Sequence, residues 1–176
     1  NIEAYHRIRQ NCDPAQVAVM FHDGFRSHVE YLGFFNEPEY RHIMYDIHRY
    51  QCFVREDVDA DIYEHLRKTV VDWRNESDTL VAELPYGTIV GEWSLGLDLK
   101  AVSLWAPGPF NHALDQMDSF QLDAAYRAYA AAQLLVFERY RGWFFWSYKT
   151  ETAAAWSFRD CVNNHWLPQR FDLDSV

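Results

Sequence analysis

Four short apolar runs, separated by segments of helical periodicity, constrain the fold of this chain more than any other feature. The runs are nearly continuous and rich in β-branched or aromatic residues, as expected for buried strands of a parallel sheet. They are QVAVMFHD (16–23), HIMYDIHRYQ (42–51), GTIVGEWS (87–94) and GWFFWSYK (142–149). Four strands are therefore predicted, each fully or largely buried.

The connection between the second and third runs carries a helical pattern. In the segment DADIYEHLRKTVVDW (59–73), four apolar residues recur at steps of four, four and three. That spacing places them on one face of an α-helix. The residues are Ile62, Leu66, Val70 and Trp73. The sequence predicts that this face packs on the sheet.

A second helix is predicted over 119–140. It begins after Asp118, with Gln121 three residues later as in a capping box, and it stops before Gly142. Strand, helix and strand therefore alternate, which indicates an α/β fold. The chain has no Gly/Ser-rich linker, no internal repeat and no internal domain boundary that we can identify.

The ends of the predicted strands distinguish two α/β architectures, a doubly wound sheet and part of a (β/α)8 barrel. Three of the four runs finish in polar or aromatic residues: His22-Asp23, then 48–51, then Glu92-Trp93. Barrel active sites are assembled at the C-terminal ends of successive strands. No GxGxxG or Walker-type loop follows any strand, which removes the main support for a nucleotide-binding sheet.

Charge and cysteine content exclude several classes of partner. The formal net charge of −10 repels phosphate backbones and anionic lipids, so neither nucleic acid nor a membrane surface is an expected partner. No apolar run approaches the roughly 20 residues of a membrane span, and the N-terminal NIEAYHRIRQ is a polar amphipathic helix. Cys12, Cys52 and Cys161 are widely spaced, which argues against a zinc site or a disulfide framework. No metal or cofactor is expected.

Glu92 is the strongest single candidate for a functional residue. It ends a strand that is otherwise apolar, directly after the segment TIVG. Burying a carboxylate there is costly unless the group is paired and used. A purely structural role, as a loop cap or the partner of an arginine, is the alternative for Glu92 alone.

The segments DIHRYQCF, GEWS and GWFFWSYKTE together resemble glycoside hydrolase family 5, and most closely its exo-β-1,3-glucanase branch. FHDGF also resembles a His-Asp-aromatic strand of that branch, and the four matches follow the same order over most of 16–158. The resemblance implies that 1–176 is the C-terminal half of a (β/α)8 TIM barrel, containing strands five to eight. It also implies retaining hydrolysis of β-glucan, an O-glycosyl hydrolase activity on oligo- or polysaccharides.

The resemblance further implies roles for individual residues. Glu92 would be the nucleophile that forms a covalent glycosyl-enzyme intermediate. Tyr50 would orient that carboxylate, and His48, on the same strand face, would line the sugar subsite. The alternative for Tyr50 and His48 is a structural role, as a pair of core side chains whose hydrogen bonds are satisfied. The implied substrate contacts are Trp146 as the sugar platform, Phe53 as an aromatic flanking the entrance, and Asp23 as a candidate hydroxyl ligand.

The tripeptide Asn36-Glu37-Pro38 looks like the Asn-Glu pair that carries the proton donor in these enzymes. In the barrel, that acid ends strand four and the nucleophile ends strand seven, which requires about 90 intervening residues at roughly 30 per β/α unit. Only one predicted strand separates Glu37 from Glu92. We therefore interpret Glu37 as a chance match in a solvent-facing loop and expect the true acid N-terminal to Asn1.

The chain departs from the family in what it contains. It supplies one of the two carboxyls of a retaining site and lacks the first four strands, including an Arg that helps to hold the nucleophile. It is therefore expected to be a fragment, or one piece of a two-part assembly whose partner is the N-terminal half-barrel. The resemblance implies an extracellular protein, although the three cysteines do not match the disulfide positions of secreted fungal members.

Two other functional classes remain open at this point. One is a non-catalytic carbohydrate-binding piece that keeps the aromatic platform but lacks the acid/base. The buried carboxylate beside Tyr50 argues against it, because a binding module has little need of one. The other is a doubly wound α/β domain of unrelated function, in which 142–149 would lie at a sheet edge.

Overall fold

The computed structural model describes residues 1–36, 38–97 and 113–171 of the 176-residue chain. Within them, four strands form one parallel sheet in the order β1-β2-β3-β4. The strands are β1 (Val19–His22), β2 (Ile43–Arg49), β3 (Gly87–Trp93) and β4 (Trp143–Phe145). Each lies inside one of the four apolar runs, so the predicted strand positions are confirmed, but β4 contains no buried residue and its predicted burial is wrong.

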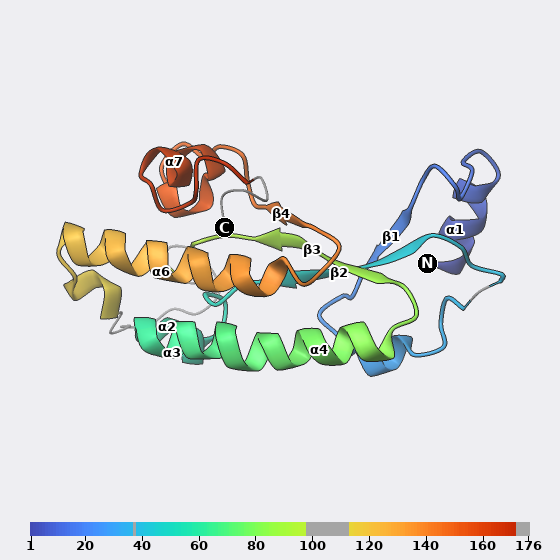
Figure 1. Ribbon diagram of the computed structural model, residues 1–176, viewed down its shortest axis with the longest axis horizontal. Helices are drawn as coiled ribbons and strands as arrows, with labels where there is room; N and C mark the ends of the chain where they lie inside the picture. The colour runs from blue at the N-terminus through green and yellow to red at the C-terminus, as the bar shows by residue number, and fades with distance from the viewer. Residues whose placement is uncertain (37, 98–112, 172–176) are drawn as a thin grey trace.

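Helices occupy the connections between strands and lie near both ends of the described chain (Figure 1). The α-helices are α1 (Ile2–Arg9), α2 (Arg55–Val58), α3 (Ile62–Arg67), α4 (Arg74–Glu83), α6 (Ser119–Phe137) and α7 (Phe158–Asn163). Short 3-10 turns are η1 (His28–Tyr31), η3 (Ala113–Gln116) and η4 (Ala154–Trp156), and η2 (Lys68–Trp73) is a π-helix.

The capping box at the start of α6 is present as predicted. The Gln121 N–H donates to Asp118 Oδ1 at 2.8 Å, and the Asp118 N–H donates to Gln121 Oε1 at 3.0 Å. Two N–H groups at the helix start are thereby satisfied reciprocally. The helix ends at Phe137, three residues before the predicted boundary.

The helix predicted over 59–73 is longer, and its buried face differs in part from the prediction. It starts at Ile62 and continues through η2 and α4 to Glu83. Val70, placed on the buried face, is 37% exposed, whereas His65 and Thr69 are almost fully buried. The buried face runs through His65, Thr69 and Trp73, so it passes along the π-helix η2 one residue before Leu66 and Val70. Gln51 pairs with both buried side chains: its Nε2 donates to Thr69 Oγ1 at 2.8 Å, and its Oε1 lies 2.8 Å from His65 Nδ1.

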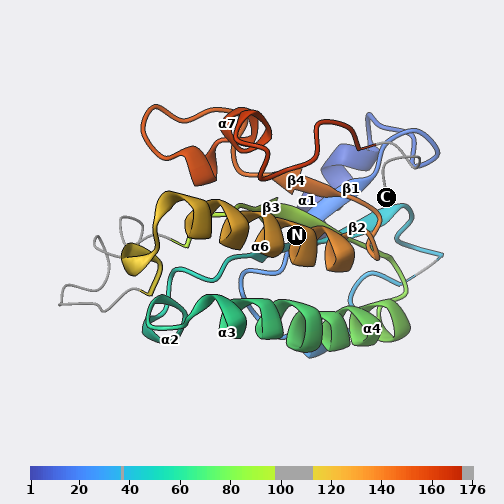
Figure 2. The ribbon, with the colours of Figure 1, turned by 60° about the vertical axis from the view of Figure 1, so that its left-hand side comes forward.

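The helical crossovers cover one face of the sheet. Figures 1 and 2 both show α4 below the strands, with α6 between α4 and α7, and η2 packs against α6. Strand order follows chain order, so the sheet has no point at which the order reverses, as a doubly wound sheet would. Although β4 lies at an edge of the described sheet, the sequential order and one-sided helices are those of consecutive β/α units of a (β/α)8 barrel.

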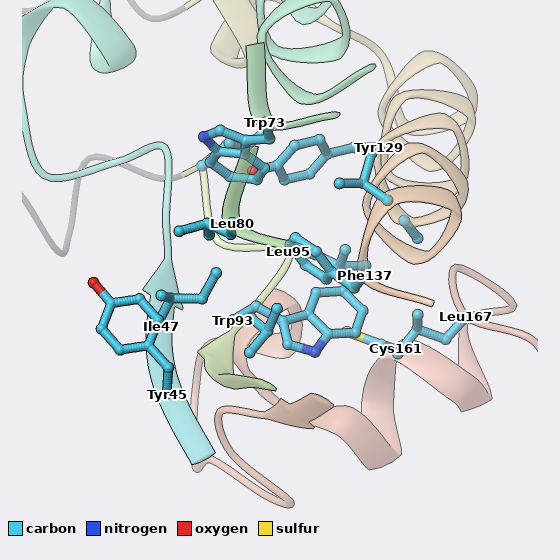
Figure 3. Close-up of a cluster of buried hydrophobic side chains, with 14 of the residues drawn as sticks. Tyr45, Ile47, Trp73, Leu80, Trp93, Leu95, Tyr129, Phe137, Cys161 and Leu167 are labelled. Atoms are coloured by element: carbon cyan, nitrogen blue, oxygen red, sulfur yellow. The ribbon is translucent and has the colours of Figure 1, made fainter. Parts of the chain in front are cut away.

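The main hydrophobic core lies between the sheet and these helices (Figure 3). Trp93 packs against Phe137 with ring centroids 5.3 Å apart, and Phe137 stacks on Trp73 at 5.9 Å. Along β1 and β2, alternate residues face this core, as the period of two requires. The opposite face of the sheet is partly open, with Met20 55% exposed and Phe144 59% exposed.

Candidate active site

Three of the predicted residues meet at the C-terminal edge of the sheet. Glu92 is the second-last residue of β3, His48 lies beside it in register on β2, and Tyr50 follows the end of β2. The Tyr50 hydroxyl donates to Glu92 Oε2 at 3.0 Å, and His48 Nδ1 lies 3.3 Å from the same oxygen. The predicted proximity of these side chains is therefore observed.

Both neighbours approach one oxygen of the Glu92 carboxylate. Tyr50 and His48 reach Oε2, which leaves Oε1 as the oxygen that neither of them contacts. Burial raises the pKa of Tyr50 far above that of a free tyrosine, and the hydrogen bond to Glu92 raises it further. Tyr50 therefore stays a neutral phenol throughout the neutral range, and its O–H donates a hydrogen bond to Glu92 Oε2.

A second polar layer lies deeper along the strands. His48 Nε2 is 3.4 Å from Asp46 Oδ2, and the rings of His48 and His22 are 4.0 Å apart. Burial raises the pKa of Asp46, and the nearby His48 and His22 oppose that rise. From the sequence, His22 was identified only as a strand-end residue, and Asp46 was not identified. The period of two would have found Asp46, because it lies two residues before His48 on the same strand face.

Gly91 makes room for this second layer. A Cβ at position 91 would lie 2.0 Å from Asp46 Oδ1 and 2.6 Å from its Cγ, so alanine cannot fit unless the carboxylate moves. Gly91→Ala is expected to lower the free energy of unfolding by about 1–3 kcal/mol through overpacking. Gly142→Ala is the matched control, because no heavy atom lies within 4 Å of its Cβ position. Urea denaturation of both variants measures the difference, and equal stability would contradict this packing.

Aromatic side chains form a wall beside Tyr50. Phe53, predicted to flank the entrance, lies with its ring 5.2 Å from that of Tyr50 and is 45% exposed. Trp156, on η4, stacks on Tyr50 at 5.4 Å with an interplanar angle of 25° and also contacts Phe53. Trp156 was not predicted from the sequence, because no spacing relates a residue beyond β4 to one that follows β2. A pocket of about 250 Å3 is lined in part by Tyr50, Phe53, His48 and Phe25.

The other two predicted substrate contacts lie near the same edge. Trp146 follows β4 directly, its N–H donates to the Trp93 carbonyl at 2.7 Å, and its side chain is 53% exposed. The backbone of Trp146 is thus tied to the residue after Glu92. Asp23, just beyond β1, is only 5% exposed, and its Oδ1 accepts the Phe25 N–H at 2.8 Å. Asp23 therefore caps a turn, and its role as a sugar ligand stays a prediction.

Glu37 lies outside the described residues. Its neighbours Asn36 and Pro38 are exposed and belong to the connection between β1 and β2.

Within the described ranges, no group of three His, Cys, Asp or Glu side chains is arranged to hold a metal ion. Over those same ranges, no helix has both the length and the apolar character needed to span a bilayer.

The amino-acid sequence of the chain is similar to those of proteins named as glucan glucosidases. No family model matches the chain. A glucan 1,3-beta-glucosidase of Candida oleophila is 29% identical over 187 residues, covering 95% of this chain and 43% of that protein. A glucan endo-1,6-beta-glucosidase B of Emericella nidulans is 33% identical over 133 residues, covering 75% and 27%. The chain is a homologue of these fungal glucan glucosidases.

The homology to glucan glucosidases extends over most of the chain but over less than half of each relative. Glucan 1,3-beta-glucosidase 2 of Wickerhamomyces anomalus, 25% identical, is matched over 89% of this chain and 40% of its own length. The chain thus spans about two fifths of the glucan 1,3-beta-glucosidases that it matches. A solved structure, the crystal structure of AoRut, matches the fold with a TM-score of 0.61 at 16% identity, over 94% of this chain and 41% of that one.

Proposed function

We propose that the protein carrying this chain is a retaining glycoside hydrolase that acts on β-glucan, and that the chain supplies the nucleophile half of its site. The observation that carries the proposal is the Glu92 carboxylate, held by Tyr50 and His48 at the C-terminal edge of a β/α sheet. Homology to proteins named as glucan glucosidases supports a glucan substrate.

The contacts at Glu92 suit a nucleophile. With Oε2 held by Tyr50 and His48, Oε1 is the oxygen that attacks the anomeric carbon. The bond from Oε1 to that carbon forms as the glycosidic C–O bond breaks, and the leaving oxygen takes a proton from an acid. Water then attacks the same carbon, returns a proton to the conjugate base of that acid and releases the Glu92 carboxylate.

Asp46 is poorly placed to be that acid. A retaining site needs its two carboxyls about 5–5.5 Å apart, on opposite sides of the scissile bond. In the β2–β3 register, Asp46 pairs with Ile89 and His48 pairs with Glu92. At about 3.3 Å per residue, Asp46 lies roughly 6–7 Å below His48 and away from the sheet edge where substrate would bind. We assign the acid to a segment N-terminal to Asn1.

The open face of the sheet supports the proposal that 1–176 is half of a barrel. Met20 and Phe144 are more than half exposed on that face, and β1 and β4 each have one strand neighbour in the described sheet. Uncovered strand edges and apolar surface favour pairing with further strands. Four additional β/α units from the N-terminal part of the same protein would close the sheet and cover both side chains.

Covalent trapping tests the proposed chemistry. A 2-deoxy-2-fluoro-β-glucoside with a good leaving group slows the breakdown of the glycosyl-enzyme, because the electronegative fluorine destabilises the oxocarbenium-like transition state. Incubation with the complete protein should add one sugar to the peptide containing Glu92, detected by mass spectrometry. Labelling of another residue, or inversion at the anomeric carbon seen by NMR, would contradict the proposal.

Trp146 should bind sugar in both the ground state and the transition state. Trp146→Ala in the complete protein is expected to raise KM and lower kcat together, reducing kcat/KM by about 10-fold or more, because the ring stacks on the sugar in the ground state and more strongly in the transition state. Tyr63→Ala, which removes a 77% exposed aromatic on α3, is the control and should leave both constants unchanged. An effect on stability alone would remove Trp146 from the subsite.

A further inference from the structure

We propose that Trp156 is a positioning residue: its indole packs on the phenol ring of Tyr50, holds that side chain in place and so keeps the Tyr50 hydroxyl at Glu92. This role rests on the proposed glycosidase function, in which the Tyr50 hydrogen bond orients the nucleophile. The residues involved come from three separate parts of the chain, Tyr50 after β2, Gly96 after β3 and Trp156 after β4.

The first observation is the ring stack. The ring centroids of Tyr50 and Trp156 are 5.4 Å apart with an interplanar angle of 25°, while Phe53 meets Tyr50 edge-on at 79°. Tyr50 is thus bounded by two aromatic rings in different planes. Its hydroxyl reaches Glu92 Oε2 at 3.0 Å from this position. A swing of the phenol about its Cα–Cβ bond, away from Trp156, would break the stack and draw the hydroxyl away from the carboxylate.

The second observation is that Trp156 itself is held in place. A Cβ at Gly96 would lie 2.2 Å from Trp156 Cε2 and Nε1, so the indole lies directly on the bare backbone of Gly96. The backbone around Trp156 is tied to neighbouring segments. The Ser147 N–H donates to the Trp156 carbonyl at 2.8 Å, and the Leu95 N–H donates to the Ala155 carbonyl at 3.0 Å. A fixed indole can hold the Tyr50 side chain in place.

The chain offers a closely matched control. Trp166 also packs against a tyrosine, Tyr126, in a tilted arrangement with ring centroids 4.4 Å apart at 36°, and its Nε1 donates to Asp123. Both tryptophans are half-buried. Because Tyr126 lies on α6 and is not among the site residues, Trp166→Ala removes a comparable Trp–Tyr contact without touching Glu92 or its partners.

The decisive experiment is a double-mutant cycle in the complete protein, assayed on β-1,3-glucan. Trp156→Ala should lower kcat by about 10- to 100-fold, the range expected for a lost hydrogen bond to a charged group, and leave KM within about twofold. In a Tyr50→Phe background the same substitution should have no further effect.

Three further variants test the same contact. Trp156→Phe should recover part of the loss of kcat, Gly96→Ala should reproduce that loss, and Trp166→Ala should leave kcat unchanged. Full additivity with Tyr50→Phe, or a rise in KM that matches the loss of kcat, would overturn the role.

A measurement that does not depend on catalysis can test the role of Trp156 separately from the proposed function. With 3-fluorotyrosine placed at Tyr50, the fluorine NMR resonance should move when Glu92→Gln removes the charged acceptor. In Trp156→Ala, the same Glu92→Gln change should leave the resonance where it is, because the hydrogen bond is already lost. An undiminished response would overturn the inference. If the complete protein hydrolyses no β-glucan, the proposed function fails, and this resonance alone decides the role of Trp156.

Discussion

Glu92→Gln in the complete protein is expected to lower turnover of β-1,3-glucan by about four to six orders of magnitude while leaving glucan binding nearly unchanged. The amide keeps the shape of the side chain and can still accept the Tyr50 hydroxyl. It cannot attack the anomeric carbon, so only the interaction made in the transition state is lost.

Glu138→Gln is the matched control for this prediction. Glu138 Oε1 accepts the Trp143 indole N–H at 2.8 Å, so it too is a glutamate bonded to an aromatic donor, but outside the proposed site. Reducing-sugar release gives the rate, and calorimetry with laminari-oligosaccharides gives the affinity. Retention of more than a few per cent of turnover by Glu92→Gln would favour the alternative of a carbohydrate-binding piece.

The 176-residue chain on its own is expected to hydrolyse no β-glucan at a measurable rate. Among the described residues, Asp46 is the carboxyl that His48 links to Glu92. It lies two residues before His48 on β2, away from the C-terminal edge of the sheet where substrate would bind. Without a proton donor at the leaving oxygen, the glycosidic bond must break to a poor alkoxide leaving group. Adding the N-terminal part of the protein should restore hydrolysis if the two halves assemble.

Glu37 provides the critical comparison for the isolated chain. Purified wild-type chain and its Glu37→Gln variant should be equally inactive on laminarin-type glucan. Robust hydrolysis by the wild-type chain that disappears in Glu37→Gln would show that the Asn36-Glu37-Pro38 segment carries the acid. The complete site would then lie within these 176 residues.

Local patterns predicted the elements of this fold well. Each strand is a run of apolar residues whose backbone pairing follows from its own composition, and the capping box at Asp118 and Gln121 is a contact between residues three apart. The helix over 59–73 was predicted less accurately. Its π turn and its extension to Glu83 depend on packing against α6 and on the partner that Gln51 offers to Thr69.

The meeting of Glu92, His48 and Tyr50 could be predicted because strands in sequential parallel order bring their C-terminal ends to one edge. A resemblance in motif order was sufficient to choose these residues. Their roles in catalysis stay predictions that the substitutions above test.

The sequence by itself determined which segments are strands, how they alternate with helices and where polar side chains follow the strands, because these features depend on neighbours a few residues apart. Only the tertiary structure decided that Tyr50 and His48 share one oxygen of Glu92 and that Trp156, lying on Gly96, stacks on Tyr50. Those contacts join residues 42 to 106 positions apart. They depend on side-chain rotamers and close packing between separate loops, which local periodicity does not encode.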